Sequence, residues 1–302
     1  MENKENQEFN VLTDLENLNE ALKNKEITKI VETICKRTNA QRQTIKENYL
    51  SNYGSNLIQE LESKLSGNVK ELILGLMMTP EDFDAKQIYD SIKGAGTDEL
   101  KLSEIIATRP SRHLSIVRDK YPQLYRETLD DAIIGDTSGC YKKLLIAIIQ
   151  GKRSDNPYPN SQKMKEIVEK LKEGEKGKIP EDIFVQYFGS CSYGEICTIC
   201  RLYEKTYNKN ILDDVKESFS NDTYDFVKIL LQYISDSGSY FAEKIHNFKP
   251  NDLTRIIISR SEVDMEEIRD AYKELYKNDL IEDLKENTKD DYQLGLTILA
   301  QK

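Results

Sequence analysis

The chain has 302 residues, more than a typical single domain, so two or more compact units or an array of repeats are expected. Its net charge of −10 argues against nucleic acid or an anionic membrane as a direct partner, although a bound divalent cation would reverse that argument locally. The composition, 38% hydrophobic and 32% charged with no Trp, is typical of a soluble, helix-rich protein.

Neither a membrane span nor a secretory signal is expected. No apolar run reaches the roughly 18–20 residues that cross a bilayer, and Met1–Asn10 has no apolar core. The five Cys residues have no framework spacing, which favours a reducing, intracellular setting. We therefore expect a cytoplasmic protein.

Four segments of the chain align without gaps and define an internal repeat. They begin at Arg37, Arg109, Cys191 and Arg260. Each carries two tyrosines spaced i and i+4, which places both on one face of a helix. These tyrosines are Tyr49 and Tyr53, Tyr121 and Tyr125, Tyr203 and Tyr207, and Tyr272 and Tyr276.

Each repeat has room for about five short helices. In the second repeat the expected helices are Asp84–Ile92, Leu100–Thr108, Arg112–Tyr121, Leu124–Ile133 and Cys140–Ile149. No segment alternates with period 2, so strands are not expected. The polar stretch Gly151–Asn160, with two prolines, is the best linker candidate and would split the chain into halves of two repeats each.

The stretch Lys93-Gly-Ala-Gly-Thr-Asp-Glu99 carries the clearest functional signal. Gly94 and Gly96 can adopt φ > 0 without steric penalty, so several carbonyls can point at one ion. Asp136, within the downstream stretch Gly135–Gly139, would add a carboxylate. Calcium takes about 6–8 oxygen ligands of these kinds. The pattern predicts a calcium site, and an ordinary helix–turn–helix is the alternative.

The four repeats of about 70 residues and the paired KGAGTDE and GDTSG motifs resemble the annexins over nearly the whole chain. The resemblance implies an all-α fold of four annexin repeats with about five helices each, arranged as a slightly curved disc of two two-repeat halves. It implies a short arm at 1–12, repeats at 13–79, 80–151, 163–235 and 236–302, and a linker at 152–162.

The resemblance also assigns ligands in repeat 2. The carbonyls of Ile92, Gly94 and Gly96 and the side chain of Asp136 would bind the primary calcium. Thr97 and Glu99 would form a lesser neighbouring site.

The other repeats depart from this pattern. The column that holds Asp136 holds Lys64, Ser218 and Asn287 in repeats 1, 3 and 4. A lysine there repels calcium, so repeat 1 should not form the standard site. Repeat 3 keeps glycines and acids over 173–182, and Glu217 lies one place from the ligand column, which leaves a weak site open. The loop of repeat 4 looks shortened.

Four charged residues match the annexin positions that form ion pairs in a hydrophilic channel between the halves: Asp84, Glu104, Arg109 and Arg260. Solvated surface charge is the alternative. We interpret them as salt bridges that orient the modules, because a buried charge needs a partner.

No catalytic constellation is evident, so an enzyme is not expected. Cys197 and Cys200 resemble half of a zinc or redox motif, but the second pair is missing, and buried, inert thiols are the better interpretation.

The sequence therefore predicts calcium-dependent, peripheral binding to acidic phospholipid at the cytoplasmic face of a membrane. One site gives marginal attachment, so self-association on the membrane would help. The alternative is a cytoskeleton-associated scaffold with an annexin fold and a cytoskeletal protein as partner. Degenerate calcium sites and a short N-terminal arm are similar to the alpha-giardin branch of the family.

Overall fold

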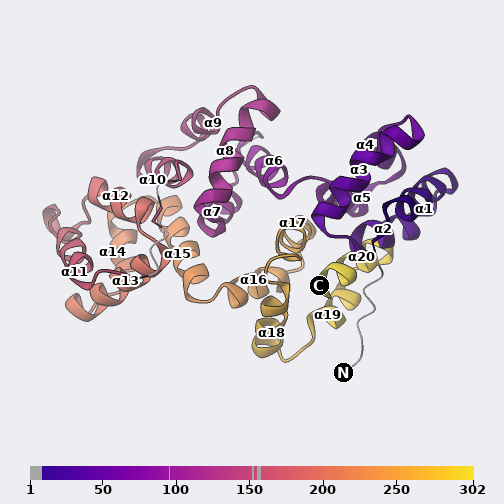
Figure 1. Ribbon diagram of the computed structural model, residues 1–302. Coiled ribbons are helices and arrows are strands. Elements are labelled where there is room, and N and C mark those ends of the chain that lie inside the picture. Colours follow the sequence, from indigo (N-terminus) through magenta and orange to yellow (C-terminus); the bar gives the residue numbers. More distant parts are fainter. Residues whose placement is uncertain (1–8, 95, 152, 155–157) are drawn as a thin grey trace. The chain divides into compact units, whose positions relative to one another are not determined.

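The computed structural model describes residues 9–94, 96–151, 153–154 and 158–302 (Figure 1). Those residues form twenty α-helices and one 3-10 helix, and they contain no strand. The expected all-α fold is confirmed. Of the predicted N-terminal arm, residues 1–8 lie outside the described residues, and the first helix begins at Val11.

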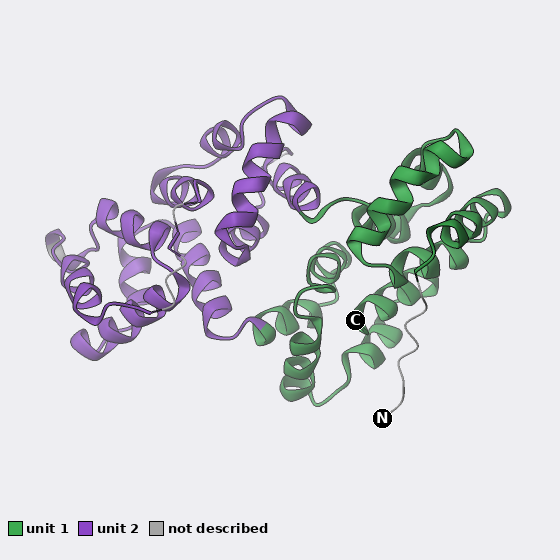
Figure 2. Cartoon of the chain, in the orientation of Figure 1, with its two compact units in different colours: residues 1–80, 238–302 green, residues 81–237 purple. Residues whose placement is uncertain are grey.

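The chain forms two compact units, each built from two repeats (Figure 2). Unit 1 comprises residues 1–80 and 238–302, and unit 2 comprises residues 81–237. The helices of unit 1 are α1 (Val11–Asn24), α2 (Ile27–Lys36), α3 (Asn39–Tyr53), α4 (Leu57–Lys64), α5 (Gly67–Leu76), α16 (Ser237–His246), α17 (Pro250–Arg260), α18 (Met265–Tyr276), α19 (Leu280–Asn287) and α20 (Asp290–Ala300).

Unit 2 contains the second and third repeats. Its helices are α6 (Pro80–Ile92), α7 (Glu99–Thr108), α8 (Ser111–Tyr125), α9 (Leu129–Asp136), α10 (Gly139–Ile149), α11 (Ser161–Lys170), η1 (Glu175–Gly177), α12 (Glu181–Ser190), α13 (Tyr193–Tyr207), α14 (Ile211–Ser218) and α15 (Asn221–Ser235). The compact units therefore pair repeat 1 with repeat 4 and repeat 2 with repeat 3. The division that we expected at the linker is wrong in this respect.

The pairing has a physical cause in the second and fifth helices of each repeat. In unit 1, α2 packs against α20 and α17 packs against α5. In unit 2, α7 packs against α15 and α12 packs against α10. These helices are apolar on more than one face, as a helix enclosed on several sides must be. In α7, for example, all residues from Leu102 to Thr108 are buried.

The tyrosine columns lie on the third helix of each repeat. The first tyrosine of each pair is fully buried: Tyr49, Tyr121, Tyr203 and Tyr272. The second packs against the first, with ring centroids 4.8–5.1 Å apart in the four repeats. The i, i+4 pattern thus marks the face that packs on the rest of its repeat.

The helices of repeat 2 are those expected, but α6 begins at Pro80 in place of Asp84, α9 ends at Asp136 in place of Ile133, and the boundary near Pro122 differs most. We expected a helix to end at Tyr121 and the next to cover 124–133, but α8 continues through Pro122 to Tyr125. It ends at Arg126, whose φ of 60° is left-handed. Thr128 then caps α9 by accepting a hydrogen bond from the Asp131 amide at 3.0 Å. The local capping residues, and not the proline, set this boundary.

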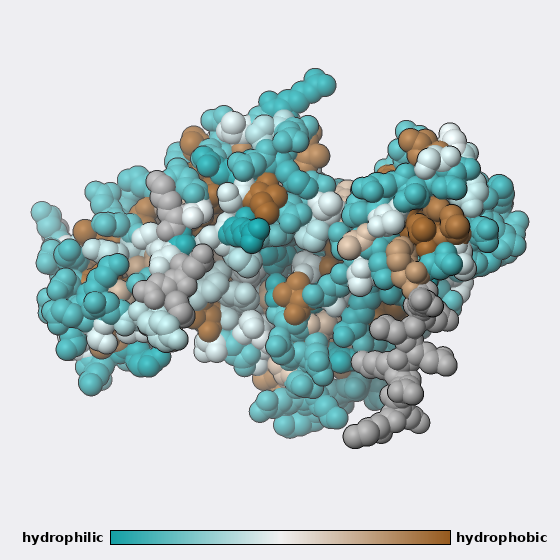
Figure 3. Space-filling model, viewed as in Figure 1, coloured by the Kyte–Doolittle hydropathy of each residue, from teal (hydrophilic) through white to brown (hydrophobic). Residues whose placement is uncertain are grey.

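The surface face seen in Figure 3 is mostly hydrophilic, with small, scattered hydrophobic patches. None of the helices in the described residues combines the length and the apolar character needed to cross a bilayer.

Close helix packing in unit 2 leads to a stability prediction. A Cβ atom on Gly189 of α12 would lie 2.6 Å from the Cβ of Ala147 of α10, closer than real contacts allow. Gly189→Ala should lower the free energy of unfolding by about 1–3 kcal/mol through overpacking, although alanine favours a helix by about 1 kcal/mol. Gly135→Ala in α9 is the control, because no atom lies within 4 Å of its added Cβ. Urea denaturation compares the two, and equal stability of both variants would contradict the packing argument.

Candidate calcium site

The loop between α6 and α7 closes back on the end of α6. The Asp98 amide donates to the Ser91 carbonyl at 2.8 Å, and the Asp98 side chain caps α7 by accepting from the Lys101 amide at 3.0 Å. Gly96 has φ = 126°, a conformation that disfavours any side chain. Ala95, within the predicted motif, lies outside the described residues. Ile92, the first predicted ligand, is the last residue of α6 and is buried.

The predicted carboxylate ligand lies at the end of α9, next to this loop. Asp136 is the last residue of α9, and Thr137 ends the helix by bonding to the Ile133 carbonyl. The Thr97 hydroxyl donates to the Asp136 carbonyl at 3.3 Å. This hydrogen bond joins two segments far apart in sequence, so the structure brings the glycine loop and Asp136 together.

A lysine supplies the positive charge at this carboxylate. The Lys93 ammonium lies 3.8 Å from Asp136 Oδ2 and 3.3 Å from Glu127 Oε1. The side chains of Lys93 and Asp136 are 38% and 35% exposed, so solvent and ions can reach both. The sequence reasoning missed Glu127, which lies in the turn before α9. Its signal was available in the repeat alignment, because Lys209 and Asn278 occupy the same column in repeats 3 and 4.

The residues of repeat 2 fit a hard cation. They offer one accessible carboxylate, a loop held open by a positive-φ glycine, and a place where a side-chain ammonium already lies close to that carboxylate. Among the described residues, no three His, Cys, Asp or Glu side chains gather into a metal-binding group.

The Glu99 carbonyl accepts a hydrogen bond from the Tyr141 hydroxyl at 3.1 Å, which anchors the start of α7.

Repeat 3 joins its first loop to the end of its fourth helix at the positions used in repeat 2, but the charges there differ. The Ile179 amide donates to the Ser218 hydroxyl oxygen at 3.0 Å, at the same place in the repeat as the contact between Thr97 and Asp136. Glu217 is 68% exposed and pairs with Lys209 at 3.2 Å. A weak calcium site in repeat 3 stays a prediction.

Lysines surround a buried carboxylate in repeat 3. Asp214 accepts hydrogen bonds from Lys172 and Lys209, each at 2.5 Å, and from the Tyr203 hydroxyl. Burial opposes its ionisation, but these donors hold the pKa of Asp214 at about 2. Repeat 3 thus has internal ion pairs in the turn before its fourth helix, where repeat 2 has Glu127.

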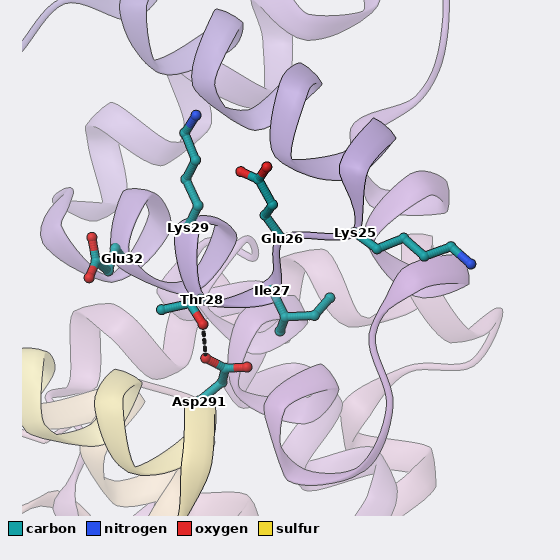
Figure 4. Close-up of a pocket in the computed structure, with 7 residues that line it drawn as sticks. All are labelled: Lys25, Glu26, Ile27, Thr28, Lys29, Glu32 and Asp291. Atoms are coloured by element: carbon teal, nitrogen blue, oxygen red, sulfur yellow. Dashed lines mark hydrogen bonds between the residues drawn. The ribbon is translucent and has the colours of Figure 1, made fainter.

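In repeat 1, a hollow of about 540 Å³ lies beside the corresponding loop (Figure 4). It is lined by Lys25, Glu26, Ile27, Thr28, Lys29, Glu32 and Asp291. The Thr28 hydroxyl donates to Asp291 Oδ1 at 2.7 Å and ties the start of α2 to α20. The Lys25 side chain points away from the other labelled side chains. Helix α1 runs on to Asn24, so repeat 1 has no glycine loop.

The loop of repeat 4 is short, as expected. Only three residues separate α16, which ends at His246, from α17. Phe248 takes a left-handed φ of 49° there, and Asn287 donates to the Asp283 carbonyl at 2.9 Å.

The four predicted channel-like charges divide between the units. In unit 2, Arg109 forms two hydrogen bonds with Asp84, at 2.7 and 3.0 Å, and both side chains are buried. Burial alone would raise the pKa of Asp84, but Arg109 and His113 hold that pKa well below its usual range. Glu104 is buried in α7. In unit 1, Arg260 pairs with Asp264.

The cysteine thiols are free. Cys197 and Cys200 lie on α13, and burial raises the pKa of the Cys200 thiol to about 12. A protonated thiol is a poor nucleophile and metal ligand.

Known proteins resemble this chain closely. The Annexin family model matches residues 13–76, 83–148 and 240–299. Annexin A6 of Mus musculus is 32% identical over 309 residues, which cover 97% of this chain and 46% of that protein. The chain therefore spans about half the length of this relative.

Solved structures agree with the family model. Annexin III superposes with a TM-score of 0.93 at 29% identity, covering 98% of this chain and 95% of the other. Calcium-bound annexin (Sm)1 has a TM-score of 0.84 at 25% identity and covers 99% and 92%. Alpha-14 giardin, 20% identical with a TM-score of 0.77, shares the fold. The architecture and the matched repeats define an annexin fold, and the chain belongs to the annexin family.

The lysine cluster around Asp214 predicts a pH dependence. An unfolded Asp has a pKa near 3.9. Because the folded pKa is lower, at about 2, the stabilisation is complete well above pH 4 and is lost as the pH falls towards 2. Between about pH 5 and pH 2, wild-type protein should lose about 2 kcal/mol more free energy of unfolding than Asp214→Asn. Urea titrations at each pH measure this, and parallel curves for the two proteins would refute it.

Proposed function

We propose that the protein binds acidic phospholipid membranes peripherally in a calcium-dependent manner, through a single intact site in repeat 2. The observation that supports the proposal is the hydrogen bond from the Thr97 hydroxyl in the glycine loop to the backbone carbonyl of Asp136, at 3.3 Å. The calcium named for annexin (Sm)1, a family member of the same fold, supports the choice of ion.

In this proposal, the carbonyls of Ile92, Gly94 and Gly96 and the carboxylate of Asp136 hold the ion, while Thr97 and Glu99 serve a lesser neighbouring site. Calcium bound there would join Asp136 to a phosphate oxygen of a lipid headgroup through its open coordination positions. Asp136 needs such a bridge, because the protein carries a net charge of −10 and an acidic membrane repels it.

A single bridge gives marginal attachment, so stable binding would draw on several molecules side by side on the membrane. The buried pair of Asp84 and Arg109 would hold the first half of α6 against the end of α7, the two helices that the loop joins, because breaking a buried ion pair is costly. We place the protein at the cytoplasmic face of the membrane.

Liposome co-sedimentation tests the proposal with Asp136→Asn. The variant should need about tenfold or more calcium for half-maximal sedimentation with anionic vesicles, because it removes the charged ligand. Asp119→Asn, which removes an exposed carboxylate from α8 of the same repeat, should behave as wild type. Neutral vesicles should leave all three proteins in the supernatant. Unchanged sedimentation of Asp136→Asn would overturn the assignment.

A second measurement tests the alternative, a cytoskeletal scaffold that makes little use of calcium. Pelleting with microtubules in the presence of a chelator, together with calcium-independent behaviour on liposomes, would favour the scaffold. Absence from the microtubule pellet would favour the lipid proposal.

A further inference from the structure

A buried tyrosine hydroxyl in repeat 2 lacks the partner that its counterparts have. In repeats 1, 3 and 4 the first tyrosine of each column donates to a carboxylate eleven residues later. These pairs are Tyr49 with Glu60, Tyr203 with Asp214, and Tyr272 with Asp283. In repeat 2 the corresponding residue is Ala132, and the fully buried Tyr121 hydroxyl has no hydrogen-bond partner among the described residues.

Repeat 2 carries an acid five residues before the position where the other repeats carry the carboxylate that the tyrosine contacts. In repeats 3 and 4 the residue five places before the buried carboxylate donates to it: Lys209 to Asp214 at 2.5 Å, and Asn278 to Asp283 at 3.3 Å. In repeat 2 that position holds Glu127, an acceptor in place of a donor. The charge pattern of the turn is therefore reversed in the one repeat that keeps the calcium motif.

Repeat 2 thus combines a buried Tyr121 hydroxyl that has no partner among the described residues with an acid, Glu127, in the turn before α9. Burial raises the pKa of this hydroxyl, and the charges of Glu127 and Asp136 add to the rise. Glu127 is the strongest of these neighbouring charges. The Lys93 ammonium lies 3.3 Å from Glu127 and 3.8 Å from Asp136, so it lies close to both carboxylates.

We propose that the Lys93 ammonium competes with calcium for Asp136 and that Glu127 holds this ammonium beside Asp136. When calcium displaces the ammonium, Glu127 accepts a hydrogen bond from the Tyr121 hydroxyl. The proposal rests on the calcium site proposed above, and it adds the residues that set the affinity of that site.

Electrostatics gives the direction of the effect. In the calcium-free protein the ammonium neutralises part of the repulsion between Glu127 and Asp136. An incoming ion must displace this ammonium, which lowers the apparent affinity. Displacement leaves Glu127 without its cation, and the adjacent Tyr121 hydroxyl is a donor that can satisfy it. A hydrogen bond to a charged group is stronger than one between neutral groups, so this exchange favours the displaced state.

Isothermal titration of calcium into lipid-free protein tests the competitor role. Lys93→Met should lower the calcium dissociation constant about threefold to tenfold, the range of one partly exposed ion pair. Lys93→Arg keeps the charge and should stay near wild type. Lys86→Met removes the same charge from α6 but contacts Asp90, so it should change the constant by less than about twofold. Equal effects of Lys93→Met and Lys86→Met would overturn the proposal.

A double-mutant cycle tests the role of Glu127. Glu127→Gln should strengthen calcium binding in the wild-type background, because Lys93 then loses the carboxylate that retains its ammonium beside Asp136. In the Lys93→Met background the same change should not strengthen binding, since no ammonium remains to be retained. Additive effects in the cycle would show that Glu127 does not act through Lys93.

Tyr121→Phe tests the exchange of partners. The variant should keep the calcium-free thermal unfolding midpoint of wild type, because its hydroxyl has no partner there, but it should show a smaller calcium-induced rise in that midpoint. Tyr203→Phe, whose hydroxyl bonds Asp214, should unfold at a lower temperature without calcium. A wild-type calcium response in Tyr121→Phe would contradict the exchange.

Asp136→Asn separates this inference from the site itself. If wild type binds calcium and Asp136→Asn does not, the assignment of the site is supported. The Lys93 and Glu127 variants then test only the competition by Lys93. If Asp136→Asn binds as wild type does, the site is wrong and the inference falls with it.

Discussion

The architecture depends on the reciprocal packing of second and fifth helices. Within a single repeat, one apolar face of each of these two helices has no partner. In each unit, the second helix of one repeat packs on the fifth helix of the other repeat. These pairs are α2 with α20 and α17 with α5 in unit 1, and α7 with α15 and α12 with α10 in unit 2. The close approach of Gly189 to Ala147 shows how tightly α12 and α10 fit together. Once the four helices are in place, the loops that join first to second and fourth to fifth helices are held at fixed positions.

On this common frame, the repeats differ mainly in charge. Repeats 2 and 3 join the first loop to the end of the fourth helix at equivalent positions but through different groups: the Thr97 hydroxyl to the Asp136 carbonyl, and the Ile179 amide to the Ser218 hydroxyl. Repeat 3 fills its neighbourhood with lysines around Asp214, whereas repeat 2 keeps accessible carboxylates. The first loop and the fourth helix thus meet at the same positions in both repeats, while the charges around them differ.

Sequence reasoning reached the fold class and the loop with Asp136, because both depend on local periodicity and on motif spacing. It did not reach the pairing of repeats 1 and 4, since the apolar faces of a helix indicate that it is buried but not which helix covers it. It misplaced the end of α8, where the caps at Arg126 and Thr128 overrode Pro122. It missed Glu127 because a lone acid in a turn has no motif: the repeat alignment shows that its column differs, and its distance to Lys93 shows what it contacts.

The composition of the two units has a consequence for how the protein forms during synthesis. Unit 2 is continuous in sequence, over residues 81–237, so it can complete its packing before the last part of the chain emerges. Unit 1 joins residues 1–80 to residues 238–302, and its first repeat must wait for the last one. During that interval α2 and α5 lack their partners, and their apolar faces are the part of the newly made chain most exposed to misassembly with other chains.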